Sequence, residues 1–335
     1  MKTNILLLLS TILFFSCSSR AKQTSIEVSA KKEINYIPYY LNVYEADSLF
    51  YAKNFEKTFN LLDELFTEFE PINVIGYDEY LLYTKVSILL GKKMNYKNVY
   101  SNLILNFGYT SEYLKKDSLL NIGLLKSQID SNEYKILRKT YLSKIDFELR
   151  DEIIEMVKFD QKFRKETIEN KGLIDSLDGI ELAKIDLINK DKLFKILNKE
   201  FPNRNKIGKS DAYGKSEYES TKIFSIINHL AHNDDSYKYL SERLHYFIEL
   251  GECNPYNLAA LNDSKYTQFI DYKDIYIGDS LNMKYKNIIS NLYFYRRFDV
   301  LSKLNSKLKE KTNKNRMIIG LPSVEQELFW RSKYN

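Results

Sequence analysis

Turn-forming residues are scarce along this chain, and their scarcity limits the folds that it can adopt. Its 335 residues include only 5 Pro and 11 Gly. A protein built mainly from β-strands needs frequent tight turns, for which these two residues are a usual choice. Long stretches rich in Lys, Glu and Leu favour helix instead. We therefore predict a mainly α-helical protein.

The overall composition is that of an ordinary globular protein. Hydrophobic residues make up 44% and charged residues 28% of the chain, which excludes wholesale disorder. The formal net charge is +5, and basic residues are mixed with acidic ones nearly everywhere, so we predict no nucleic-acid partner. The densest basic stretch, 303–316, is predicted to be a solvated helix end, with contact to anionic lipid as the alternative.

The first 16 residues have the layout of a secretion signal. Lys2 supplies one positive charge, and an apolar run from Ile5 to Phe15 follows it, broken only by one Ser and one Thr. This run is shorter than the roughly 20 apolar residues that cross a bilayer. We therefore predict that residues 1–16 are a signal peptide.

The segment from Leu13 to Cys17 resembles the lipobox of bacterial lipoproteins. Ser16 is the small residue expected before the cysteine, whereas Phe15 replaces the usual small or β-branched residue. The resemblance implies diacylation of the Cys17 thiol, cleavage before it and acylation of the new amine. Several acyl chains on one residue meet the requirement for stable anchoring. The alternative is an ordinary cleaved signal in which Cys17 is incidental.

Residues 17–35 are predicted to be a flexible tether, because they are polar at their start and show no apolar periodicity. By resemblance to envelope lipoproteins, Ser18 gives no signal for retention in the inner membrane. No acidic cluster follows the cysteine to indicate export to the surface. We expect a protein that contacts the membrane through its N-terminal lipid, at the outer membrane and facing the periplasm.

The chain has two cysteines, and lipidation of the first decides what the second can do. If Cys17 carries lipid, Cys253 has no partner in the same chain, so no intramolecular disulfide is expected. Zinc sites built on thiolates are excluded for the same reason. The hydrophobic core must therefore stabilise the fold.

Residues 36–145 are predicted to form an array of helical hairpins. Apolar residues recur at i, i+3 and i+4 within segments joined by short links. The predicted helices are 43–53, 55–69, 77–90, 96–107, 111–126 and 133–143. The small and apolar positions of the first pair resemble a tetratricopeptide unit, although the Trp and Gly of that pattern are missing. These positions are Ala46, Leu49, Thr58, Leu62 and Leu65.

Residues 146–335 are predicted to form a second, mostly helical domain. Helices are expected over 149–169, 180–200, 219–250 and 281–311, and the stretch 253–278 is expected to be less regular. Six short motifs follow one another in this region. They are Asp160-Gln161-x-x-Arg164, Phe201-Pro202 before Gly208, Asn228-His229 before Asp234, Leu258 to Asp263, Tyr266 to Phe269, and Gly320-Leu321-Pro322.

The ordered set of motifs resembles the landmarks of a bacterial family of domains of unknown function. Two motifs depart from the family pattern. Glu200 and Phe201 stand where the family has Gly and Trp, and the segment that begins at Tyr266 lacks one glycine. The resemblance covers somewhat over half of the chain and implies no known activity, but it directs attention to the motif residues.

Asp160 and Arg164 lie one turn apart in the middle of the apolar face of the helix predicted over 149–169. Charges seldom enter a core unless they are paired. One interpretation is a structural ion pair that orients neighbouring helices. The other is a ligand site in which Arg164 holds an anion and Asp160 orients it. Gln161 lies at the edge of this face and fits either interpretation.

All three histidines lie on the helix predicted over 219–250. Only His229 falls well within its apolar stripe, whereas His232 and His245 lie near or beyond the margin. His229 and His232 lack the i, i+4 spacing and the Glu of the common zinc-hydrolase helix, so we predict no metal and no cofactor. His229 is interpreted either as a satisfied, half-buried histidine or as part of a non-metal polar site.

Two other patterns carry no chemistry in our interpretation. Gly208-Lys209-Ser210 resembles a phosphate-binding loop, but Arg204 replaces the glycine required five residues before the lysine. The chain also has 27 tyrosines, with clusters at 36–40 and 293–295. We interpret these clusters as core and interface aromatics, with stacking on glycan rings as the alternative.

Two functional hypotheses follow. The first is a non-enzymatic binding or scaffolding module, in which the hairpin array docks an envelope protein or peptide and the second domain binds a small ligand or peptide. The second is a hydrolase of the cell envelope that uses Asp160, His229 and Asp263, with Arg164 as an anion clamp. Gln268 is a further candidate ligand residue. The second hypothesis requires that its side chains converge in one site.

Overall fold

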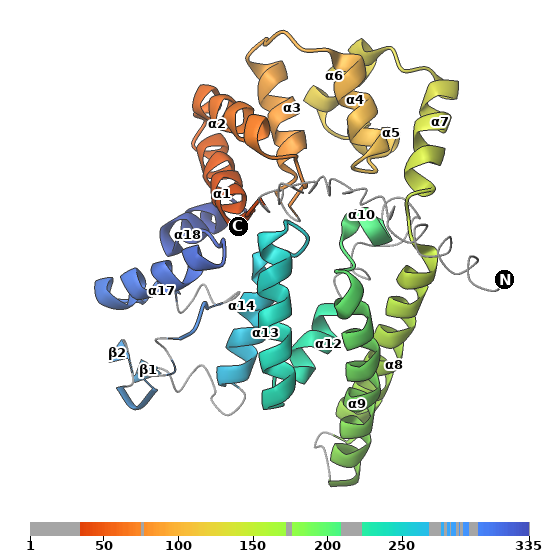
Figure 1. Cartoon of the computed structure of the whole chain (residues 1–335). Coiled ribbons are helices and arrows are strands. Elements are labelled where there is room, and N and C mark those ends of the chain that lie inside the picture. The colour runs from red at the N-terminus through yellow and green to blue at the C-terminus, as the bar shows by residue number, and fades with distance from the viewer. Residues whose placement is uncertain are drawn as a thin grey trace, which may run out of the picture. The chain divides into compact units, whose positions relative to one another are not determined.

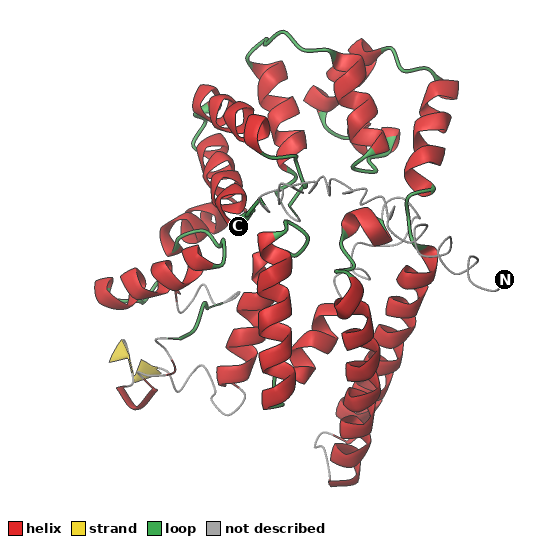
Figure 2. Ribbon diagram, in the orientation of Figure 1, coloured by secondary structure: helices red, strands yellow, loops and turns green. Residues whose placement is uncertain are grey.

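The computed structural model describes the chain in several ranges, and it is mainly α-helical there, as predicted (Figure 2). Cys17, the signal segment and Gln268 lie outside the described residues. No helix in the described part is long and apolar enough to cross a membrane. The described ranges are 34–74, 77–171, 176–208, 223–267, 276–277, 280–281, 283–285, 288, 291–294 and 301–334.

The first seven helices pack mainly against one another. Helix α1 packs on α2 and α2 on α3, while α4 packs on both α6 and α7 (Figure 1). The elements are α1 (Ile37–Tyr51), α2 (Phe55–Glu68), α3 (Glu79–Leu89), α4 (Tyr96–Leu105), α5 (Ser111–Lys115), α6 (Ser118–Ser127) and α7 (Ser131–Leu142). The prediction of one helix over 111–126 is wrong. The Asp117 side chain accepts hydrogen bonds from the N–H groups of Leu119 and Leu120, and so starts a new helix there.

The later helices build the part of the chain that holds the candidate site. Helices α8 and α9 form a hairpin, α12 packs against both, and α13 packs against α14 (Figure 1). The elements are α8 (Phe147–Lys171), α9 (Ser176–Lys199), α10 (Arg204–Ile207), α12 (Ile223–Leu230), α13 (Asp234–Glu249), α14 (Pro255–Thr267), α17 (Ser306–Ile318) and α18 (Val324–Tyr334). A two-residue hairpin of β1 (Tyr276–Ile277) and β2 (Ser280–Leu281) and the 3-10 turn η3 (Met283–Tyr285) precede α17.

The prediction of one helix over 219–250 is wrong, and the break changes where the histidines lie. The chain turns between α12 and α13, and the Asn233 side chain caps α13 by accepting a hydrogen bond from the N–H of Ser236. His229 therefore belongs to α12, the exposed His232 lies in the turn, and His245 belongs to α13.

Two further predictions of secondary structure are also wrong. The stretch 253–278 was expected to be less regular, but α14 occupies its first half and begins at Pro255, a residue that favours the first turn of a helix. The prediction of one helix over 281–311 is also wrong, because strand β2 and the 3-10 turn η3 lie at its start, and its last six residues, from Ser306, belong to α17. The apolar pattern of this range did not distinguish such short elements from one long helix.

The largest group of buried apolar residues draws on both predicted regions. It contains Tyr39 and Tyr40 of α1, Ile226 of α12, Leu244 of α13 and Leu321 before α18. The core thus crosses the boundary at residue 145, and residues 34–335 form one compact unit. Tyr39 and Tyr40 are 0% and 1% exposed, which confirms for these two residues that the first tyrosine cluster is core.

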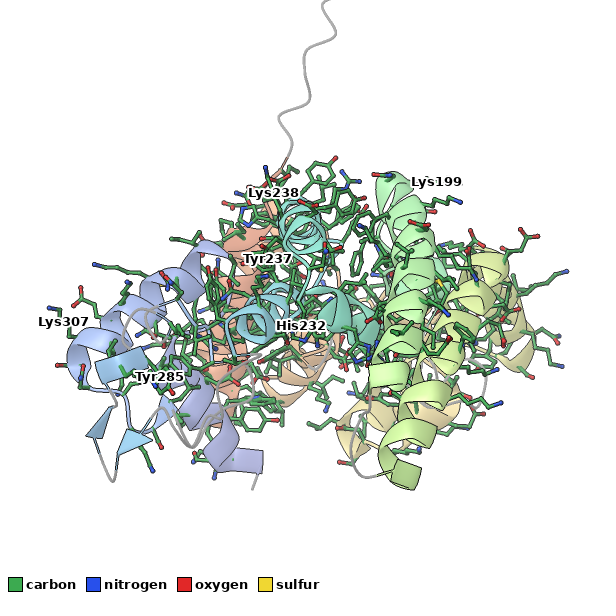
Figure 3. The ribbon with its side chains drawn as sticks, turned by 90° about the horizontal axis from the view of Figure 1, so that it is seen from below. Lys199, His232, Tyr237, Lys238, Tyr285 and Lys307 are labelled. Carbon is green, nitrogen blue, oxygen red and sulfur yellow. The ribbon has the colours of Figure 1, made fainter. Side chains whose placement is uncertain are left out.

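Exposed lysines are spread over the described surface. Figure 3 shows Lys199 on α9, Lys238 on α13 and Lys307 on α17, three helices from distant parts of the chain. The basic stretch 303–316 is only partly the solvated helix end that was predicted. Lys307 is exposed, but Arg316 at the other end of the stretch is 1% exposed and paired with Glu327.

Candidate functional site

Four residues of the predicted site meet where α8 packs against α12. Asp160, Gln161 and Arg164 come from α8, and His229 comes from α12. The Asp160 side chain is fully buried, while the side chains of Arg164 and His229 are 18% and 27% exposed. The expectation that Asp160 faces the core is therefore confirmed, and the cluster is closed on one side and half-open on the other.

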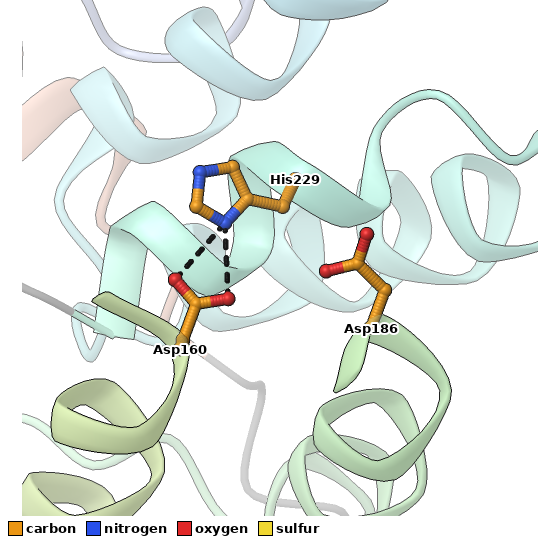
Figure 4. A group of neighbouring side chains, drawn as sticks. All are labelled: Asp160, Asp186 and His229. Atoms are coloured by element: carbon orange, nitrogen blue, oxygen red, sulfur yellow. Dashed lines mark hydrogen bonds and ion pairs between the residues drawn. The ribbon is translucent and has the colours of Figure 1, made fainter. Parts of the chain in front are cut away.

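Asp160 accepts hydrogen bonds from side chains on three helices. Gln161 Nε2 donates to its Oδ2 at 2.7 Å, and Arg164 Nε donates to its Oδ1 at 3.1 Å. His229 Nδ1 lies 3.3 Å from Oδ1 and 3.2 Å from Oδ2 (Figure 4). Asn189 Nδ2, from α9, lies 3.5 Å from Oδ1. This one carboxylate therefore fixes the positions of an imidazole, a guanidinium and two amides.

A second carboxylate, Asp186 of α9, faces the same cluster. Arg164 Nη2 donates a hydrogen bond to its Oδ1, so the guanidinium bridges the two aspartates. The Asp186 side chain is 28% exposed. Asp160, Asp186 and His229 each place one potential ligand atom within 4.8 Å of the others (Figure 4). Three different helices thus supply three groups that can bind a metal.

The surroundings of the two aspartates shift their pKa values in opposite directions. Burial acts to raise the pKa of Asp160, but the hydrogen bond and charge of His229 and the charge of Arg164 outweigh it, so this pKa is lowered. Burial raises the pKa of Asp186, and the opposing charges of Arg164 and His229 do not offset it. Asp160 is therefore the firmly ionised member of the pair.

Asp186 and Asn189 were missed by the sequence analysis, although a signal for them was present. The apolar stripe of α9 runs through Ile185 and Leu193, which are 4% and 0% exposed. Asn189 lies between them, one turn from each, and is 1% exposed. A polar residue in the middle of an apolar stripe is the same signal that identified Asp160. Asp186 lies beside this stripe and was harder to recognise.

Asp263 is placed in a different set of contacts. It is 4% exposed on α14, and its Oδ1 accepts a hydrogen bond from the N–H of Tyr293 at 2.8 Å. The neighbouring Asn262 donates to the carbonyl of Asn291 at 2.9 Å. Both side chains attach the segment 291–294 to α14. The structure therefore gives Asp263 a structural contact and does not show it beside His229.

His232 also lies apart from the cluster. It is exposed in the turn after α12, and its carbonyl oxygen lies 3.5 Å from Lys265 Nζ. Lys265 also pairs with Asp234. His232 is thus not among the groups that meet at Asp160 in the described structure.

The arrangement can bind a ligand or transfer a proton at its half-open side. Because Nδ1 of His229 faces Asp160, Nε2 is the ring nitrogen left for a ligand or a reacting group. Arg164 contacts both carboxylates and its side chain is 18% exposed, and a guanidinium is the group best suited to planar anions. No family model, curated protein or solved structure matches this chain, so only the geometry supports an assignment of function.

Proposed function

We propose that this chain is a lipid-anchored binding protein of the bacterial cell envelope and that the cluster around Asp160 is its ligand site. One observation carries the second half of the proposal. A fully buried carboxylate holds an imidazole and a guanidinium side by side, and both of these groups are partly exposed. Their partial exposure leaves both groups accessible to a ligand.

The chemistry of the exposed groups indicates the ligand. Arg164 and His229 both donate hydrogen bonds, and a guanidinium matches the geometry of a carboxylate or a phosphate. We therefore propose a small molecule or peptide that carries such an anionic group. The predicted docking of an envelope protein or peptide on α1 to α7 remains part of the proposal, supported by the packing of α1 on α2 and of α2 on α3.

The anchor is the other half of the proposal, and the sequence alone supports it. Replacing Cys17 with Ser should release the protein from the membrane or leave the signal uncleaved. Fractionation of cells that express each form, with the mass of the mature N-terminus, measures both effects. A Cys17→Ser protein that stays in the outer membrane and is processed normally would contradict the anchor.

Ligand binding is best tested on the histidine rings. The full chain in detergent, labelled with ¹⁵N-histidine, should be titrated with inorganic phosphate and with acetate as probes. We expect a saturable shift of the His229 ring signals that Arg164→Gln abolishes. His245, which is 37% exposed and lies near Glu249, provides the internal control, because it should not respond. Equal shifts at both rings, or none, would remove the support for this site.

A hydrolase is the second candidate, and the contact between His229 and Asp160 favours it. A carboxylate at Nδ1 orients an imidazole so that Nε2 can take a proton from water or a hydroxyl group. Because Asp263 lies elsewhere, the proposed machinery reduces to Asp160, His229 and Arg164. Hydrolysis of p-nitrophenyl acetate above background, lost in His229→Gln and kept in His245→Gln, would favour the enzyme over the binding protein.

A further inference from the structure

We propose that Asp160, Asp186 and His229 together bind one divalent transition-metal ion, such as Zn²⁺ or Mn²⁺. The inference rests on the proposed function, because it names what makes the ligand site attractive to an anion. It also departs from the sequence prediction of no metal, which considered His232 and not Asp186. The spacing of the donor atoms, the hydrogen bonds to the carboxylates, the net charge of the cluster and the types of donor atom all favour it.

The spacing of the donor atoms suits a shared ion. Two ligands of one tetrahedral zinc ion, each about 2.0–2.2 Å from the metal, lie roughly 3.4 Å from each other. His229 Nδ1 lies 3.2 and 3.3 Å from the two oxygens of Asp160. Asp186 offers a third ligand atom from a third helix, within 4.8 Å of the other two.

The surrounding side chains hold the carboxylates as outer partners of a metal site do. Gln161 donates to Asp160 Oδ2, and Arg164 donates to one oxygen of each aspartate. Carboxylate ligands of metals are themselves hydrogen-bonded, and these bonds fix their orientation. Arg164 donates to Oδ1 of Asp186, so Oδ2 is the oxygen that would contact the ion. Arg164 therefore does not need to leave the site when a cation binds.

The cluster holds more carboxylates than guanidinium groups. With a neutral imidazole, the form of histidine that binds a metal, its two carboxylates and one guanidinium carry one net negative charge. A divalent ion changes the net charge of the cluster to positive. The same ion then explains how a site with two aspartates attracts an anionic ligand.

The donor set indicates which cations fit. One imidazole nitrogen with carboxylate oxygens suits zinc, manganese or iron, whereas magnesium and calcium prefer oxygen donors alone. Three protein ligands leave at least one position for water or for the ligand. The partial exposure of Asp186 and His229 puts that position on the half-open side of the cluster.

The experiment is a metal titration of the full chain in detergent. The protein is stripped with EDTA, freed of the chelator and titrated calorimetrically with ZnCl₂ and with MnCl₂. We expect one ion per chain for the wild type. Asp186→Asn and His229→Gln should each weaken binding by well over tenfold, and Gln161→Leu by about tenfold through the outer partners. Circular dichroism establishes that each variant is folded.

A matched control separates the proposed site from surface binding. His245 and Glu249 form an exposed histidine–carboxylate pair, with 3.6 Å between Nε2 and Oε1. His245→Gln should leave both the stoichiometry and the affinity unchanged. If the wild type does not bind one ion per chain, the proposal is overturned. This test does not depend on any variant. Equal affinity in the wild type and in folded Asp186→Asn would also overturn it.

Phosphate titration of stripped and metal-loaded protein distinguishes this proposal from the proposed function. Phosphate that binds only the loaded protein supports both. If phosphate binds the stripped protein equally well, the anion-binding site is supported, and the proposal that the metal attracts the anion is contradicted. Stoichiometric metal without phosphate or acetate binding supports the metal site and contradicts the anionic ligand.

Discussion

Two arginine–carboxylate clusters of this molecule differ in how completely they are closed. Arg316 and Glu327 are 1% and 4% exposed, and they pair at 2.9 Å. The other two guanidinium nitrogens of Arg316 donate to the carbonyl groups of Pro322 and Tyr293 at 2.6 and 2.8 Å. Charge is balanced one to one, and every nitrogen of the guanidinium donates a hydrogen bond.

The cluster around Asp160 is arranged differently. Its central carboxylate is fully buried, but the side chains of Arg164, His229 and Asp186 are 18% to 28% exposed. Its carboxylates outnumber its guanidinium. The comparison teaches that the same residue types can be closed off or left accessible. The closed pair ties α17, α18 and the segment 291–294 together, whereas the half-open cluster leaves partly exposed groups, as the proposed ligand site requires. The predictions below test that distinction.

The largest effect is expected at the closed pair. Arg316→Ala leaves the Glu327 carboxylate buried without its partner, which should lower the free energy of unfolding by about 3–5 kcal/mol. Urea unfolding followed by circular dichroism measures it. Lys314→Ala is the control, because the Lys314–Glu310 pair is 72% and 69% exposed and should contribute little. Similar stability losses in the two variants would show that closure does not distinguish the clusters.

The next effect concerns a buried carboxylate with no ion pair in the described structure. Asp47 of α1 is 5% exposed, and burial raises its pKa to about 7, with the Trp330 side chain partly opposing the shift. Between pH 4 and 7 the folded chain therefore binds more protons than the unfolded chain, so stability falls as pH rises through that window.

Asp47→Asn removes this pH dependence. Relative to the wild type, the variant should gain about 2–4 kcal/mol between pH 4.5 and pH 8, because each pKa unit corresponds to about 1.4 kcal/mol. Urea unfolding at both pH values measures the difference. A wild-type minus variant difference that does not change with pH would mean that Asp47 is solvated or paired. The contrast between Asp47, which has no ion pair in the described structure, and Glu327, which pairs with Arg316, would then lose its physical basis.

Much of the helical architecture was predictable, and the reasons for the failures are local. The helices near 55–69 and 96–107 were predicted to within two residues because their apolar faces repeat cleanly. The breaks at Asp117 and Asn233 were missed, although each is a side-chain cap. Such a cap acts through one hydrogen-bonded turn, whereas periodicity averages over many residues.

The candidate site was predictable in part for a similar reason. Asp160, Arg164 and His229 each broke an apolar stripe, and the packing of α8 on α12 brings them together. Their partner Asp186 lies beside the stripe of α9 and gave little signal. Asp263 interrupted an apolar segment equally well, but it holds the N–H of Tyr293 instead. A polar residue in a core therefore identifies a satisfied buried group, and only tertiary structure shows which groups meet.

A smaller effect is expected at the centre of the half-open cluster. Asp160→Asn removes the negative charge that His229 and Arg164 face. It also puts an NH₂ group, which donates hydrogen bonds, where these two side chains need an acceptor. Hydrogen bonds to charged groups contribute about 1.5–3 kcal/mol, and we expect a loss in that range at pH 7. Thermal and urea unfolding measure it. An unchanged stability would show that the buried carboxylate contributes to ligand binding only.

The smallest effect on stability is expected at Asp186, and it is the most informative. Asp186→Asn keeps an oxygen that can accept from Arg164 and removes a negative charge facing Asp160. Its side chain is 28% exposed, so the change in stability should stay below about 1 kcal/mol. Unfolding in urea, run beside Asp160→Asn, measures the difference between two equivalent substitutions on either side of one guanidinium. If Asp186→Asn costs as much as Asp160→Asn, both aspartates stabilise the fold, and the open cluster resembles the closed one. If it costs little while metal binding is lost, Asp186 contributes to binding without stabilising the fold, as expected where a site is retained for its ligand.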